Sequence, residues 1–227
     1  MQDTPLTSRA GVLASDRPRG PSPYILSYRE LRTSIGIIGI ALPVVLATGK
    51  WLLESQGLLD SISAYYYSVM RGVFVGSLWA IAVFLFSYRY ARADNIASKI
   101  VSICALGVSL FPAAPANPTD QQQAIGIAHT VFAAGFFLTL AYFALFLFRK
   151  TYPDQQPTRQ KQTRNRVYLI CGLAMVFCLA LIVLLGFLPD PEWLLQLHPF
   201  FILEALSVEA FGIAWFIKGG AILKDKA

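Results

Sequence analysis

Long apolar stretches alternate with short polar segments along the chain, and six of these stretches are candidates to cross a membrane. A helix needs about 20 mostly apolar residues to span the hydrocarbon of a bilayer. The third stretch is short and ends at the proline-containing sequence FPAAPANP, so we expect its helix to take a turn from the polar residues before it. The pattern predicts an all-α, polytopic membrane protein built as a six-transmembrane-helix bundle. The six stretches are residues 34–53, 72–87, 97–111, 125–148, 167–188 and 199–217.

The same pattern divides the chain into three parts. Residues 1–33 are predicted to be a cytoplasmic tail that is mostly disordered, because its first part has too little apolar mass to offset the entropy of ordering. A short interfacial segment, residues 24–32, is expected to lead into the first span. Residues 34–218 form the predicted six-helix transmembrane domain, and residues 219–227 form a cytoplasmic C-terminal tail.

The distribution of positive charge predicts the orientation. Lys50 and Arg71 are expected on one side of the membrane, and the other 17 of the 19 Lys and Arg residues fall in the segments expected on the opposite side. The positive-inside rule then places both termini in the cytoplasm, as an even number of spans requires. We therefore expect a multi-pass protein of the bacterial cytoplasmic (inner) membrane. Orientation also explains the net charge of +6, so membrane lipids are the expected partners and nucleic acid is not.

Small residues indicate which helix faces pack closely, because lipid provides no hydrophobic drive between helices. Gly36 and Gly39 lie in the first span, and Gly72 and Gly76 form a G-x-x-x-G pair in the second. We expect both pairs to pack inside the bundle; an oligomer is possible but not indicated. All three cysteines lie in spans, and no Cys or His residues have the spacing of a zinc site. The sequence thus predicts neither a metal site nor a cofactor.

Ionisable side chains inside a span are costly unless they are paired, so each is a functional candidate. Three qualify: His129 in the fourth span, and Glu204 and Glu209 in the sixth. Glu204 and His129 are expected in the outer half of the bilayer, while Glu209 lies nearer its middle. Glu204 and Glu209 are about 140° apart around the helix, so they are not expected to form a paired-carboxylate site.

The segment DSISAYYYSVMRG, residues 60–72, is expected just above these groups on the outer side. Its three consecutive tyrosines cannot all face one way, so at most two of them can line a pocket. Arg71 is the expected partner of Glu204. We hypothesise an outward-facing polar pocket between the helices, although such a pair could equally brace the bundle without binding anything. The predicted ligand-binding residues are Ser63, Tyr66, Arg71, His129, Glu204 and Glu209.

Three functions fit this pattern. The favoured one is binding of a lipid or small amphiphile in the outward-facing pocket. The second is a membrane-embedded, hydrolase-like enzyme that modifies lipids with His129 and Glu204, with Ser61 or Ser63 as nucleophile. The third is a proton-coupled small-molecule transporter that relays protons through Glu209. None of the common catalytic sequence motifs is present. The sequence leaves enzymatic activity open and favours the non-catalytic role.

The order of several short motifs resembles a known family. GIIGIALPVVLATG is followed by SISA, RGVFVGSLWAIAVFL, LFPAAP and IAHTVFAAGFF. This series resembles the bacterial six-helix membrane family called domain of unknown function 998 and, more distantly, the DRAM/Frag-like proteins. The resemblance covers residues 35–219 and implies a six-helix fold rather than an activity. Ile62 and the PAAP sequence depart from the polar residues that the family often has there, which weakens any catalytic role that those positions imply.

Overall fold

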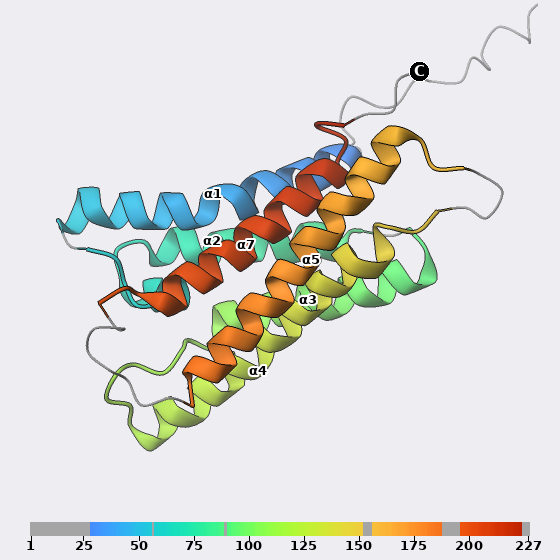
Figure 1. Cartoon of the computed structure of the whole chain (residues 1–227). Coiled ribbons are helices and arrows are strands. Elements are labelled where there is room, and N and C mark those ends of the chain that lie inside the picture. The colour runs from blue at the N-terminus through green and yellow to red at the C-terminus, as the bar shows by residue number, and fades with distance from the viewer. Residues whose placement is uncertain (1–27, 56, 89, 152–155, 188–195, 224–227) are drawn as a thin grey trace, which may run out of the picture.

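Helices account for the regular structure of the chain. The computed structural model describes residues 28–55, 57–88, 90–151, 156–187 and 196–223, and these contain no β-strand. By length and composition, the described residues form five helices that can cross a membrane, which indicates a multi-pass, all-α membrane protein. Figure 1 shows these helices as one elongated bundle. They are α1 (Tyr28–Glu54), α3 (Arg92–Leu110), α4 (Asp120–Tyr142), which continues through Leu147, α5 (Arg159–Leu185) and α7 (Pro199–Lys218).

The ends of the helices differ in places from the predicted spans. The second span corresponds to α2 (Arg71–Phe86), whose 16 residues make it the shortest of the apolar helices. The third takes its extra turn from the polar residues before it, as expected, because α3 begins at Arg92. The first helix begins at Tyr28, so part of the predicted interfacial segment is continuous with the span. The predicted tail lies otherwise outside the described residues, as do residues 224–227.

Helices α1 and α7 run antiparallel in close contact along much of their length (Figure 1). A Cβ atom added to Gly36 would lie 2.5 Å from the Phe216 backbone nitrogen, and one added to Gly212 would lie 2.5 Å from the Ile40 nitrogen. Gly39 faces the Gly212 Cα atom in the same way. The two backbones therefore touch where both helices lack a side chain, which confirms the packing predicted for Gly36 and Gly39.

The second glycine pair does not pack in this way. Cβ atoms added to Gly72 and Gly76 would meet nothing within 4 Å, and both residues are exposed. The prediction that this G-x-x-x-G pair lies against another helix of the bundle is therefore wrong. Gly36 and Gly39 are three residues apart and Gly72 and Gly76 are four apart, and either spacing puts both glycines on one helix face, but α2 turns this face outward.

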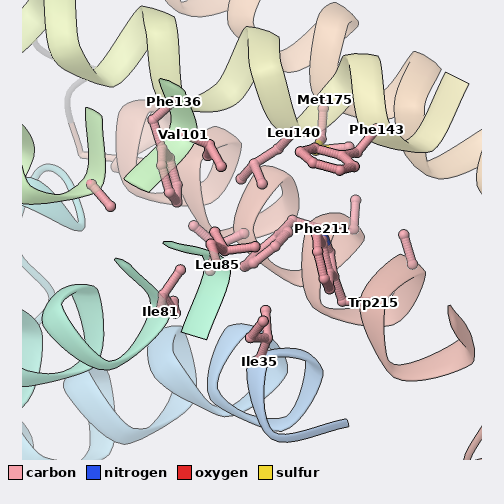
Figure 2. Packing of buried hydrophobic residues seen from close by; sticks show 14 of the residues in the cluster. Ile35, Ile81, Leu85, Val101, Phe136, Leu140, Phe143, Met175, Phe211 and Trp215 are labelled. Carbon is pink, nitrogen blue, oxygen red and sulfur yellow. The ribbon is translucent and has the colours of Figure 1, made fainter. Parts of the chain in front are cut away.

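A shared apolar core lies between the helices. Trp215 of α7 is buried and makes ring contacts with Tyr88, Phe143, Phe148 and Phe211. Figure 2 shows side chains of this core converging from every apolar helix. The labelled residues are Ile35, Ile81, Leu85, Val101, Phe136, Leu140, Phe143, Met175, Phe211 and Trp215.

Helix α4 widens into a π-helical turn, η2 (Phe143–Leu147), before it ends. The Phe148 amide donates to the Phe143 carbonyl five residues earlier, at 2.9 Å. Turns of this kind are rare and occur often at functional sites. Here the turn places the Phe148 ring against Trp215 and Tyr168, at the end of the bundle where the N-terminus of α1 meets the C-terminus of α7.

Replacing Gly212 by valine is expected to lower the free energy of unfolding by about 1–3 kcal/mol or more, because the new side chain would overlap the α1 backbone. The measurement is reversible unfolding of the purified full-length protein in detergent. Gly76→Val is the matched control, since its added carbons would enter open space. Equal losses in the two variants would show that close contact between α1 and α7 is not what matters.

Candidate functional site

The segment that carries the serines and tyrosines folds as a short 3-10 helix, η1 (Ser63–Tyr67), between α1 and α2. The Ser61 hydroxyl oxygen accepts a hydrogen bond from the Ala64 amide at 3.0 Å. The Ser68 hydroxyl oxygen accepts one from the Met70 amide at 3.1 Å, immediately before α2 begins. These side chains fix the turn on both sides of η1 and so set the position of Ser63.

The three tyrosines of η1 point in different directions, as predicted. Tyr65 is fully buried, Tyr66 is half-buried, and Tyr67 is 54% exposed and donates to the Ala113 carbonyl at 2.9 Å. Burial raises the pKa of the Tyr65 phenol, so this group stays protonated at neutral pH. Tyr65 therefore serves packing, and Tyr66 is the member that lies beside Arg71.

Ser63, His129 and Glu204 meet at one point, and we call them the Ser63–His129–Glu204 cluster. The His129 Nδ1 atom lies 2.7 Å from the Phe111 carbonyl oxygen and its Nε2 atom 3.1 Å from the Ser63 hydroxyl. A carbonyl oxygen can only accept, so Nδ1 carries the proton. In the neutral ring, Nε2 then accepts from the Ser63 hydroxyl. The Glu204 Oε2 atom accepts from the Ser63 backbone amide at 3.2 Å.

The structure corrects the predicted pairing of Glu204 with Arg71. Arg71 instead donates from Nη2 to the Tyr66 hydroxyl, and its guanidinium carbon lies 4.1 Å from the centre of the Tyr66 ring. Lys50, the other cation predicted on this side, forms an ion pair with Glu54 at 2.8 Å. Glu204 is thus held by the backbone of the loop before α2 and not by a cation.

The six predicted binding residues do not line one pocket. A cavity of about 40 Å³ lies beside Ser63 and Glu204, and the rest of its lining is apolar. That volume suits about one water molecule, whose share of the liquid is about 30 Å³. Tyr66 and Arg71 lie at a separate groove, and Glu209 lines neither space. The predicted pocket is therefore two sites, of which only the groove has room for an amphiphile.

The groove lies between α2 and α3 and has a volume of about 510 Å³. Arg71 and Tyr66 lie at the N-terminal end of α2, and the outward-facing Gly72 and Gly76 keep side chains out of the space. We call this space the Arg71 groove. It is lined by Tyr66, Arg71, Gly72, Val75, Gly76, Ser109 and Leu110.

The chemistry available to the Ser63–His129–Glu204 cluster is limited by its contacts. A serine hydroxyl bonded to a histidine nitrogen is the arrangement of a nucleophile and its base. Here, however, the histidine is oriented by the Phe111 carbonyl, and Glu204 contacts the serine backbone. The cavity of about 40 Å³ has no room for an acyl group in this conformation. In this structure the cluster links η1 to α4 and α7 through polar contacts.

One polar contact had no signal in the sequence. His198, immediately before α7, lies with its Nδ1 atom 3.1 Å from the Asp60 carboxylate, and the Phe201 amide donates to the Asp60 carbonyl at 2.8 Å. The two residues are 138 positions apart, and only the fold brings the start of α7 to the loop before η1.

No family model matches the chain, and the comparisons with curated proteins and with solved structures found no match. The resemblance to the domain of unknown function 998 family therefore stays a prediction. Within the described ranges, no three His, Cys, Asp or Glu side chains lie close enough together to hold a metal ion.

Glu204→Ala is expected to lower the free energy of unfolding by about 1–3 kcal/mol, because it leaves the Ser63 amide without its acceptor. Glu204→Gln keeps an acceptor oxygen at the same place and should lose less. Both are measured by unfolding in detergent, with Glu209→Ala as the control on the same helix. If the glutamine variant loses as much as the alanine variant, the negative charge and not the hydrogen bond is what the site requires.

Proposed function

We propose that the protein is a six-span protein of the bacterial cytoplasmic membrane that binds an anionic lipid or amphiphile in the Arg71 groove. Both termini are proposed to be cytoplasmic. The concentration of Lys and Arg in the tails and in alternate loops supports this orientation. It also assigns the groove mouth, with Arg71, to the outer side. The proposal keeps the predicted class of ligand and moves its site away from Glu204.

The single observation that carries the proposal is the shape of the groove. The groove has a volume of about 510 Å³. The α2 backbone forms part of its wall at Gly72 and Gly76, which have no side chain to fill the space. Val75 and Leu110 add apolar surface. A space of this kind on a membrane-facing helix is suited to an acyl chain, which fills it without requiring a hydrogen bond.

The polar end of the groove adds selectivity for charge. The Arg71 side chain is exposed, and stacking over Tyr66 limits its freedom before a ligand arrives. A guanidinium can donate two parallel hydrogen bonds to a phosphate or carboxylate. An amphiphile with its chain along Gly72 and Gly76 would therefore be held with its anionic head at Arg71.

The orientation can be tested with single cysteines. We expect Ala116→Cys, in the exposed loop before α4, to be labelled in intact bacteria by a membrane-impermeant maleimide. Thr163→Cys, near the start of α5, should be labelled only after the membrane is opened. The chain's own three cysteines are buried and give the background. The reverse pattern would contradict the proposed orientation, and labelling of both positions in intact cells would contradict an α4 span.

The groove can be tested by filling it. Native mass spectrometry of the purified protein in the presence of phosphatidylglycerol should show one lipid fewer retained by Gly76→Leu than by the parent protein. Arg71→Gln should weaken retention of phosphatidylglycerol about tenfold, since it removes a charge-assisted contact, with little effect on phosphatidylcholine.

Val83→Leu is the matched control, because Val83 is exposed on α2 but does not line the groove. Equal lipid retention by Gly76→Leu and Val83→Leu would overturn the proposal. If Gly76→Leu instead converts a dimer to a monomer without changing lipid retention, the groove is occupied by a second copy of the chain.

A further inference from the structure

The end of the bundle opposite η1 contains two adjoining cavities, of about 500 and 420 Å³. They share Lys161 and Arg164 of α5 and Lys218 of α7. We call the two cavities together the basic cleft. Among the described residues that line it, Asp94 is the one carboxylate. The cations that line it are Arg29, Arg32, Lys150, Lys161, Arg164 and Lys218.

Backbone carbonyls hold several of these cations in place. Arg29 Nε and Arg32 Nη1 donate to the carbonyls of Gly219 and Lys218, each at 3.2 Å. Lys161 Nζ donates to the Phe148 carbonyl at 3.1 Å, just after the π-helical turn. Carbonyls at the C-terminal end of a helix attract cations, and these contacts orient the side chains that make them.

Helix α5 adds a second source of positive potential. Gln156, Pro157 and Thr158, immediately before α5, line the larger cavity, and the Thr158 side chain caps the helix by accepting from the Lys161 amide. The N-terminus of a helix favours anions, because its first amides point outward and the peptide dipoles align. In the cleft this end lies among side chains that are themselves cationic.

Asp94 is a weak competitor for these charges. It is buried, and the Lys150 ammonium lies 3.8 Å from its Oδ2 atom. That distance is longer than a hydrogen bond. Orientation in the membrane accounts for cations at this end of the protein, but not for the gathering of six of them around two adjoining cavities, where Asp94 is the one carboxylate among the described lining residues.

We propose that the basic cleft binds a phosphate group, carried either by the headgroup of an anionic lipid or by a free phosphate. The proposal does not rest on the Arg71 groove, which lies at the other end of α2 and uses none of these residues. The ammonium and guanidinium groups on α5 and α7 would donate to the phosphate oxygens, as would the first backbone amides of α5. The apolar part of the larger cavity's wall leaves a place for the first carbons of a lipid.

The test is ligand-induced stabilisation of the full-length protein in a neutral maltoside detergent. The midpoint of thermal unfolding is followed against added inorganic phosphate, and separately against phosphatidic acid with phosphatidylcholine as the uncharged reference. Ionic strength is held constant with NaCl. Stabilisation by both phosphate-bearing probes supports a free-phosphate site, and stabilisation by phosphatidic acid alone supports a lipid headgroup site. No stabilisation by either probe overturns the proposal.

Variants assign any effect to the cleft. Lys150→Gln combined with Lys218→Gln should weaken binding about tenfold or more, because two charge-assisted contacts are lost. Lys99→Gln combined with Arg92→Gln removes two exposed cations of α3 that do not line the cleft, and binding should be unchanged. Equal weakening in both double variants would mean that only the net charge matters, and the proposal would fail.

Asp94→Asn should change binding in the opposite direction. Removing the competing carboxylate is expected to tighten binding of phosphate severalfold, an outcome that partial unfolding cannot produce. Weaker or unchanged binding in this variant would contradict the proposed site. Arg71→Gln should leave the response to inorganic phosphate intact, so failure of the groove proposal and failure of this one are separate results.

Discussion

The backbone contact between α1 and α7 is the constraint on which the rest of the structure depends. In lipid, apolar side chains gain little by leaving their surroundings, so helices associate where their backbones can approach closely. Gly36 and Gly39 meet Gly212 and the backbone beside Phe216, and this contact fixes the relative height of the two helices. That height brings Arg29 and Arg32 to the last carbonyls of α7 at one end of the bundle. At the other end, α7 carries Glu204 to the amide of Ser63.

Polar groups in this protein are satisfied mainly by the backbone. Glu204 accepts from an amide, His129 donates to the Phe111 carbonyl, and Lys161 and Arg164 donate to carbonyls. A buried backbone amide or carbonyl needs a hydrogen-bond partner, so a polar side chain that bonds to it satisfies both groups at once. A carbonyl is neutral, so it orients a cation without adding an opposite formal charge, unlike the carboxylate in the ion pair of Lys50 and Glu54. The two proposed binding regions differ in this respect, because Arg71 is held by the Tyr66 side chain, whereas Arg29, Arg32 and Lys161 donate to backbone carbonyls.

The sequence predicts much of the fold and less of the site, and the reason differs for each. Hydropathy locates the apolar helices because hydrocarbon thickness sets their length. The cost of an ionisable group in a span singles out His129 and Glu204, and the structure brings both to Ser63. Ser63 was also among the residues named with them, but their backbone partners could not be predicted, because a backbone amide or carbonyl occurs at every residue and leaves no pattern. Gly72 and Gly76 share one helix face, as the packed Gly36 and Gly39 do, and nothing local in the sequence shows that their face points outward.

The shortness of α2 has a consequence for the surrounding lipid. Its 16 residues extend about 24 Å at 1.5 Å per residue, less than the roughly 30 Å of a typical hydrocarbon layer. As a span it would be mismatched, while the 27 residues of α1 and of α5 exceed the same thickness. The bilayer beside α2 would therefore have to thin, at a cost of fractions of a kcal/mol per Å. The thinning would be confined to the side of the bundle where α2 lies, and the Arg71 groove would open onto the lipids that are most compressed.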